Sequence, residues 1–241
     1  IAGDIKSPLQ VAGVFNIADS VSGFQVAGVF NAADDVRGGQ IASILNVADD
    51  VRGVQIGLVN VAEDLHGIQL GLVNIARNGV NCLGSLYEPD TGYAYGLWQA
   101  GSRALYTIAT VGAPREDWFV RDSAFLVSFG LGSRTRIFGL NLDLDISAVQ
   151  PVENRVAEFR TALESGDCPD WRSLDPYPSA RLTLGVPLFG KLQLVCGTKV
   201  DFQLEVGGTV PESQKVDGSW SGRALGLNYS AYPKVFAGVK F

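Results

Sequence analysis

Between Gln10 and Gly79 the chain repeats one pattern of apolar and polar residues five times. Each unit opens on a glutamine, continues through alternating aliphatic residues to an asparagine, and closes with a polar segment that ends in glycine. The units read QVAGVFNIADSVSGF, QVAGVFNAADDVRGG, QIASILNVADDVRGV, QIGLVNVAEDLHGI and QLGLVNIARNG. The alternation predicts a β-strand and the Asp-Asp and Gly residues predict a turn. The β-branched content and the frequent glycines disfavour a helix.

The glutamines and asparagines recur in step along the repeats, with spacings of 15, 15, 15 and 14 residues. A fixed short period of this kind indicates a repeat architecture, in which no single unit can bury its own apolar face. The residues in question are Gln10, Gln25, Gln40, Gln55 and Gln69, with Asn16, Asn31, Asn46, Asn60 and Asn74.

Two β architectures fit this period. In a β-solenoid each unit is one coil, equivalent residues stack about 4.8 Å apart, and the glutamines and asparagines form amide ladders. One apolar column is then formed by Val26, Ile41, Ile56 and Leu70. In an antiparallel meander each unit is one strand plus a tight turn, and nothing requires Gln and Asn to recur in register. The strict recurrence therefore favours a solenoid of five units over residues 1–80.

An acidic row follows the turns of the repeats, and it is the one place in the repeats where metal chemistry is conceivable. Stacked coils would bring its carboxylates together, and a hard cation could relieve their repulsion. The alternative, which we favour, is a solvated turn edge with Arg37 and Arg52 as counter-charges. The row consists of Asp19, Asp34, Asp35, Asp49, Asp50, Glu63 and Asp64.

After Cys82 the repeats stop and longer alternating segments begin. In residues 138–147 apolar side chains from Phe138 to Ile146 alternate with small or polar ones, and residues 192–206 show the same pattern. This alternation predicts an antiparallel sheet with one apolar and one polar face. We expect a link over 81–92 and then about eight strands, near 93–100, 103–112, 123–133, 135–147, 179–189, 191–206, 223–232 and 234–241.

Several of these segments reach lengths that suit a tilted membrane-crossing strand of about 9–11 residues. The last strand ends on Phe241, as terminal strands of outer-membrane barrels do. A soluble sandwich or a small closed barrel would show the same alternation. We favour an antiparallel β-barrel-like domain over 93–241, with membrane insertion as its expected environment.

A long loop over 148–178 interrupts these strands. Pro151 begins a segment with helical spacing of apolar residues that stops at Gly166. Trp171 and Tyr177 follow in rigid loop sequence and fit a recognition surface. The alternative, which we rate higher, is that they pack the loop onto its own domain.

Composition and charge exclude some functions. The 241 residues carry a net charge of −6, with a pI near 4.8 and no basic cluster, which disfavours nucleic-acid binding. The chain starts at Ile1, which fits removal of a signal peptide or a trimmed sequence. The apolar runs are too short for a transmembrane helix.

The three cysteines are widely separated. Cys82 and Cys168 lie in loop-like sequence and could pair in an oxidising compartment or stay free. Cys196 lies on the apolar face of a predicted strand, where we expect a small buried residue. With one histidine and no CxxC motif, the chain lacks the ligands and partners for a zinc site or thiol–imidazole catalysis.

No arrangement of residues predicts catalysis. The single histidine, His66, occupies a repeat position that also holds Ser22, Arg37 and Arg52, so we expect a tolerant surface site. Asp143 and Asp145 share one strand face, which we assign to a polar lumen or solvent face beside Arg134 and Arg136. The segment GLGSRT (130–135) lies between two predicted strands and is expected to be a hairpin, not a phosphate loop. We predict no catalytic, cofactor-binding or metal site.

The phrase GVQIGLVNVAEDLHGIQLGLVNIARNG resembles the repeats of a bacterial surface-repeat family, whose units run G-V-Q-h-G-h-h-N-h-A. RALYTIATVG, FGLG (129–132) and FGLNLDLDIS (138–147) are similar to the tail that follows those repeats. The resemblance covers about residues 10–150, and more loosely the rest. It implies an exported protein of the bacterial envelope and transfers no catalytic residue.

The sequence therefore predicts an all-β protein with a short-period β-solenoid followed by an antiparallel β-barrel-like domain. Its expected role is non-enzymatic, either structural or partner-binding, at the bacterial outer membrane or cell surface. Other envelope proteins or lipid are the expected partners, and no cofactor is expected. One alternative is a small outer-membrane channel or ligand-binding barrel with the solenoid as a plug. Another is a soluble periplasmic or secreted adhesin.

Overall fold

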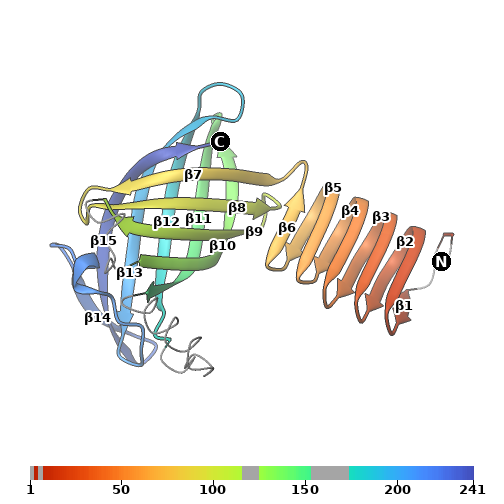
Figure 1. Cartoon of the computed structure of the whole chain (residues 1–241), viewed down its shortest axis with the longest axis horizontal. Helices are drawn as coiled ribbons and strands as arrows, with labels where there is room; N and C mark the ends of the chain where they lie inside the picture. Colours follow the sequence, from red (N-terminus) through yellow and green to blue (C-terminus); the bar gives the residue numbers. More distant parts are fainter. Residues whose placement is uncertain (1–2, 5–7, 116–124, 153–173) are drawn as a thin grey trace, which may run out of the picture. The chain divides into compact units, whose positions relative to one another are not determined.

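The structure is a computed structural model that describes residues 3–4, 8–115, 125–152 and 174–241. The chain divides into two compact units. The first comprises Ile1–Cys82, Gln99–Thr107 and Leu131–Thr135, and the second Leu83–Trp98, Ile108–Gly130 and Arg136–Phe241. The described residues form a parallel solenoid sheet and a closed antiparallel barrel (Figure 1), which confirms the predicted fold class.

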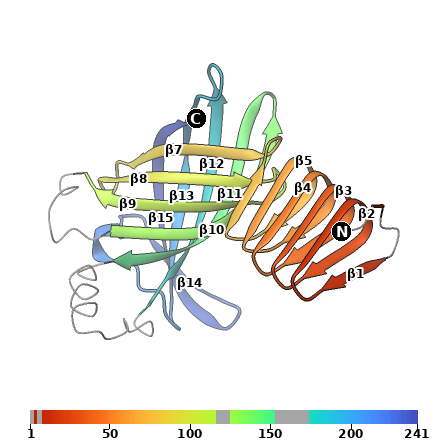
Figure 2. The ribbon, with the colours of Figure 1, turned by 45° about the vertical axis from the view of Figure 1, so that its right-hand side comes forward.

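The repeats form a six-stranded sheet in sequence order, in which every neighbouring pair is parallel. Gln25 is in register with Gln40, and Asn31 with Asn46, so one repeat makes one coil and the meander is excluded. The coils stack like steps in Figure 2. The strands are β1 (Leu9–Ala12), β2 (Phe15–Ala27), β3 (Phe30–Ala42), β4 (Leu45–Ile56), β5 (Val59–Leu70) and β6 (Val73–Ala76).

The predicted amide ladders are present inside the coils. Asn31 Nδ2 donates to Asn46 Oδ1 at 3.0 Å and to the carbonyl of Ile41, on the opposite side of its own coil, at 2.9 Å. Gln40 Nε2 donates to Gln25 Oε1 at 3.0 Å. Both ladders are buried, so each side-chain amide bonds to the equivalent amide of a neighbouring coil instead of to water. The ladders fix the register of the repeats.

Glycine closes the bend of each coil. Gly38 has a φ of 134°, and a Cβ added to it would lie 2.1 Å from the carbonyl oxygen of Gly23 in the preceding coil. Only glycine permits both this backbone conformation and this approach of stacked coils. This is the physical reason that every complete repeat ends its polar segment in glycine.

The core of the solenoid is thin and built from small side chains. It contains the alanines and valines of the polar segments, exemplified by Ala33, Val36, Ala48 and Val51. The column predicted from Val26 to Leu70 forms, but it faces outward, because the inward positions beside it belong to the glutamine ladder. The solenoid therefore carries its larger aliphatic residues on its surface.

Eight strands form the closed barrel, with successive strands adjacent and β15 pairing with both β13 and β7. A further strand, β14, pairs with the start of β15. The barrel strands are β7 (Val80–Glu88), β8 (Tyr93–Gly101), β9 (Tyr106–Pro114), β10 (Phe125–Ile137), β11 (Leu140–Val152), β12 (Tyr177–Pro187), β13 (Gln193–Leu204) and β15 (Leu227–Lys240), and β14 spans Trp220–Ala224.

Three expectations about these strands differ from the structure. The expected link over 81–92 contains β7, whose alternating residues include the buried Cys82 and Leu86. The two strands expected at 223–232 and 234–241 are mainly one strand, β15, since Pro233 lies within the ladder with β13. The segment 130–135 lies inside β10, and the hairpin turn falls at Phe138–Gly139, where both residues have positive φ.

The expected loop over 148–178 is shorter than predicted. β11 continues to Val152 and β12 begins at Tyr177, because Val149 and Tyr177 pair directly and both side chains are buried. Tyr177 therefore packs inside the domain and is not a recognition residue. Pro151 belongs to β11, and the remainder of the predicted helix and Trp171 lie outside the described residues.

The connections differ in length at the two ends of the barrel. At the end where the chain enters β7, the strands are joined by the short segments 102–105, 138–139 and 188–192. At the other end the connections are 89–92, 115–124, 153–176 and 205–226, of which three are longer than any at the first end. We call these the short-turn end and the long-loop end.

Replacing Asn46 by leucine should destabilise the solenoid, because Asn31 Nδ2 and Asn60 Oδ1 would each lose a buried partner. The expected cost is about 1–3 kcal/mol for each group left unpaired, measured by chemical denaturation of the full chain. Asp49→Leu in the same coil, at an exposed site, is the matched control. Equal stability of the two variants would contradict the structural role of the ladder.

Candidate functional site

The outer surface of the barrel is apolar. On each strand alternate side chains point outward, and most of the exposed ones are aliphatic or aromatic. Ile146, at the middle of β11, is 64% exposed. The exposed outward residues include Leu83, Tyr87, Val111, Val127, Phe129, Leu144, Leu182, Leu184, Val186, Leu194 and Val235.

The charged residues of the eight barrel strands all occupy the other, inward-facing positions. On β13 these positions also hold Val195, a core residue, and on β15 they hold Phe236. The barrel strands therefore carry all their charges on the inward face and mostly apolar residues on the outward face, whereas a water-soluble barrel exposes its charges. The charged residues are Glu88, Arg134, Arg136, Asp143, Asp145, Arg181, Lys199, Asp201, Lys234 and Lys240.

A charged cluster joins four strands in the barrel interior. Lys199 Nζ lies 2.7 Å from Glu88 and 3.5 Å from Asp201, and it also donates to the hydroxyl of Tyr95 at 3.2 Å. Asp201 forms a second ion pair with Lys234. Lys199 and Lys234 face each other across the β13–β15 ladder, so the two carboxylates separate two cations that would otherwise repel.

Two further ion pairs continue this interior. Lys240 Nζ lies 2.8 Å from Asp143, and Arg181 Nε lies 3.2 Å from Asp145. All these groups are at most 8% exposed. Among the residues that the structure describes, the buried carboxylates are Glu88, Asp143, Asp145 and Asp201, and the buried cations are Arg181, Lys199, Lys234 and Lys240, so four negative charges meet four positive ones.

The connection between β13 and β14 fills the interior from the long-loop end. Its short 3-10 helix, Glu212–Gln214, places Gln214 where it accepts hydrogen bonds from Lys234 at 2.7 Å and from Tyr95 at 3.3 Å. Val210 of the same connection belongs to the buried core, along with the aromatic rings of Tyr93 and Tyr177. The interior is a packed core at this level.

Aspartate 175 holds this connection in place. Its carboxylate accepts hydrogen bonds from the backbone amides of Gly208 at 2.5 Å and Thr209 at 2.9 Å. The bonds from Gly208 and then Thr209 lower the pKa of Asp175 below its ordinary value of 3.8. The stabilising effect is therefore present above that value and is lost as the pH falls through the lowered pKa.

Aromatic side chains gather on the outward positions near both ends of the strands. Trp98 lies near the short-turn end of β8, and Phe241 follows β15 at the same end. Phe138 and Phe189 occupy the turns there and are 100% and 74% exposed. Toward the long-loop end the outward aromatic residues are Tyr87, Phe125, Phe202 and Tyr229.

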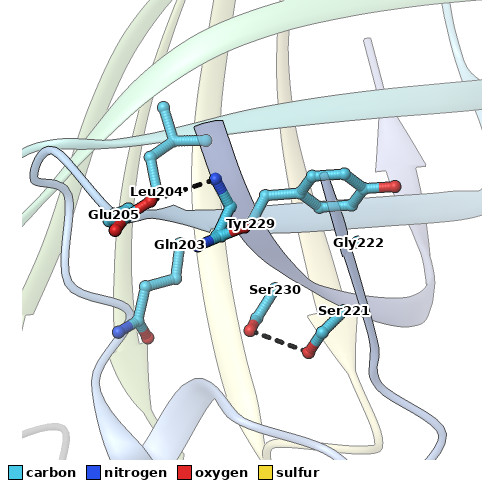
Figure 3. Close-up of a pocket in the computed structure, with 8 residues that line it drawn as sticks. Gln203, Leu204, Glu205, Ser221, Gly222, Tyr229 and Ser230 are labelled. Atoms are coloured by element: carbon cyan, nitrogen blue, oxygen red, sulfur yellow. Dashed lines mark hydrogen bonds between the residues drawn. The ribbon is translucent and has the colours of Figure 1, made fainter. Parts of the chain in front are cut away.

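A hollow of about 450 Å³ lies where β13, β14 and β15 extend past the barrel (Figure 3). The Ser221 and Ser230 hydroxyls are 3.1 Å apart, and the Glu205 carboxylate accepts the Asn228 amide at 3.3 Å. In Figure 3 the Tyr229 ring points away from these serines. Because the ring and the polar groups do not converge, we assign no ligand to this hollow.

The acidic row is an exposed edge of the solenoid. Asp35, Asp50 and Asp64 are in register on successive coils, and Ser20 takes the equivalent place on β2. His66 is exposed and in register with Arg52, as expected for a tolerant surface site. Within the described ranges, no group of three or more His, Cys, Asp or Glu side chains is placed to hold a metal ion.

Of the two cysteines that the structure describes, one contradicts its expectation. Cys82 is a free, buried thiol that donates to Gln99 Oε1 at 3.1 Å, and Cys168 lies outside the described residues. Cys196 is on the predicted apolar face of β13 but is exposed, not buried. The expectation for Cys196 was wrong because the apolar face of this strand is the outer one.

Asp143 and Asp145 lie in a polar interior, one of the two environments expected for them. The sequence missed the partners of this pair, Lys240 and Arg181, and the cluster around Lys199. The inward positions of Lys199 and Asp201 were visible as the polar face of the 192–206 segment. Which charged residues of different strands meet in the interior depends on how the strands close into a barrel. No local sequence signal predicts that pairing.

No family model, curated protein or solved structure matches this chain. In the part of the chain that the structure describes, no helix is long and apolar enough to cross a membrane.

Replacing Lys240 by methionine should lower the free energy of unfolding by about 3–5 kcal/mol, because it removes one partner of a buried ion pair. Chemical denaturation of the full chain measures the loss. Lys191→Met, at an exposed turn position, is the matched control and should change little.

The double variant Lys240→Met with Asp143→Leu should lose less stability than the two single variants combined. It removes both charges of the pair, so no buried charge is left without a partner. Additive losses, or equal effects of the variants at Lys191 and Lys240, would contradict the structural role of the pair.

Proposed function

We propose that this chain is a non-enzymatic protein of the bacterial outer membrane, in which the barrel spans the bilayer and the repeats serve as a scaffold or binding surface. The observation that carries the proposal is the distribution of charged and apolar residues over the two faces of the barrel strands. Its strand charges occupy inward positions, whereas its exposed outward positions are mostly aliphatic or aromatic. A surface of this kind is unfavourable in water and favourable against lipid acyl chains.

The dimensions of the barrel support this environment. The eight strands contain 9 to 14 residues, and a tilted strand needs about 9–11 to cross the hydrocarbon core. Closure through the β15–β7 pairing leaves no open edge at that point, as a bilayer requires. The aromatic residues near both strand ends match the girdles that such barrels place at the two lipid–water interfaces.

The lengths of the connections support an orientation. Outer-membrane barrels have short periplasmic turns and longer extracellular loops. In this proposal the short-turn end, with 138–139 and 188–192, faces the periplasm, and the long-loop end faces the cell exterior. The chain enters β7 at the short-turn end, so the repeats that precede it are assigned to the periplasmic side.

Structural features favour a scaffold over the alternatives. A channel needs an open polar path, but the interior charges are paired and Gln214 and Val210 fill the barrel from one end. A soluble adhesin would expose charged residues on its barrel, whereas here the outward positions hold residues such as Leu144 and Ile146. We therefore assign to the barrel the role of an anchor, and we propose envelope proteins or lipid as partners of the repeats.

The proposal is tested by refolding the full chain from urea into lipid vesicles and following the heat-dependent shift in gel mobility of the folded barrel. Ile146→Arg should weaken folding by about 2–4 kcal/mol, because it places a charge at the middle of a lipid-facing strand. The matched control is Leu225→Arg, at a fully exposed turn between β14 and β15, which should have an effect within about 0.5 kcal/mol.

Two results would contradict the proposal. One is a wild-type chain that folds and stays monomeric without detergent or lipid. The other is an equal effect of arginine at the two positions, since a water-exposed surface tolerates both.

A further inference from the structure

The solenoid has two chemically opposite edges. The acidic row lies along one edge and is exposed. At the other edge, where each strand ends and the next begins, the equivalent residues of the five coils form an exposed aliphatic column, which we call the apolar corner. It consists of Val14, Val29, Ile44, Leu58 and Leu72, which are 57%, 37%, 49%, 49% and 50% exposed.

The apolar corner is held in register by backbone hydrogen bonds between successive coils. The amide of Val29 donates to the carbonyl of Val14 at 2.8 Å, and the amide of Leu72 donates to that of Leu58 at 3.0 Å. Stacked coils lie about 4.8 Å apart, so the column runs for roughly 19 Å. The backbone amides of Val29, Ile44, Leu58 and Leu72 are engaged within the solenoid, and the side chains of the apolar corner offer no hydrogen-bonding group to a partner.

Outward residues on both sides widen the apolar corner into a band. The column before it runs through Val11 (68% exposed) to Leu70, and the column after it begins with Phe15 (46% exposed). These flanking columns hold only aliphatic and aromatic residues, namely Val11, Val26, Ile41, Ile56 and Leu70 on one side and Phe15, Phe30, Leu45, Val59 and Val73 on the other.

We propose that the apolar corner inserts into the lipid bilayer, so that the solenoid lies on the membrane with its acidic row toward water. The same separation of an apolar face from a charged face holds amphipathic helices at the membrane interface. Protein interfaces usually carry about one hydrogen bond per 100–200 Å² and rely on aromatic and arginine anchors. The apolar corner and its flanking columns offer no hydrogen-bonding side chain and no arginine, and acyl chains require neither.

The covalent connection supports lipid as the occupant. Only three residues, Arg77–Gly79, separate β6 from β7, the first strand of the barrel. This inference rests on the proposed function: if the barrel is embedded, so short a tether keeps the repeats at the membrane surface. The effective concentration of lipid at the apolar corner is then high, and weak insertion becomes persistent.

Nitroxide labels on the full chain in lipid vesicles test the inference. The native cysteines are replaced (Cys82→Ala, Cys168→Ser, Cys196→Ser), and single labels are attached at Ile44→Cys on the apolar corner, Asp49→Cys on the acidic row, and Leu144→Cys on the barrel. The readout is the ratio of collision rates with oxygen, which partitions into lipid, and with a water-soluble nickel chelate.

Insertion predicts a ratio at Ile44 that is several-fold higher than at Asp49 and close to that at Leu144. A low ratio at Ile44 together with a high ratio at Leu144 would overturn the inference while leaving the membrane barrel intact. A low ratio at Leu144 would overturn the proposed function, and with it the premise of this inference.

A second copy of the chain is the competing occupant of the apolar corner. In that case the Ile44 label would be shielded from both reagents and would show spin–spin coupling that disappears when labelled protein is diluted with unlabelled protein. Such coupling would overturn insertion into lipid. A label that collides with oxygen and shows no coupling supports it.

Discussion

The architecture of the barrel depends on one constraint, the alternation of side chains along closed strands. Successive residues of a strand face opposite sides. The charged residues of the barrel strands occupy the alternate positions that face the interior, where each is stable only beside an opposite charge. Lys199 meets Glu88 and Asp201, and Asp201 in turn meets Lys234. The same alternation sends Leu144 and Ile146 outward. The inward charges and the apolar outward face are thus two consequences of one pattern.

The interior of the solenoid is filled by uncharged side chains. Its coils are too thin for large apolar side chains, so alanine, valine and the amide ladders fill them. The larger aliphatic residues, including Ile44 and Leu58, are left on the surface. Both units therefore expose bulky apolar side chains on their surface, and this shared property connects the two proposals made for the membrane.

The sequence predicts the periodic features and a barrel-like domain, but not which strands close the barrel. The recurrence of Gln40 and Asn46 was enough to predict the coils and their ladders, because equivalent residues of parallel strands must stack. The apolar face holding Cys196 was also visible, but not that this face lies outside. That outcome depends on contacts distant in sequence, such as Lys240 with Asp143. For the same reason β7 was taken for a link, since its partner β15 ends the chain.

The central claim is that the outward face of the barrel contacts lipid. Nuclear Overhauser effects in lipid nanodiscs test it most directly, using protein with protonated methyl groups only at isoleucine and leucine. The account predicts cross-peaks between acyl-chain protons and the methyl groups of Leu144, Ile146 and Leu182, and none from these methyl groups to water. Cross-peaks to water in place of acyl chains would contradict it.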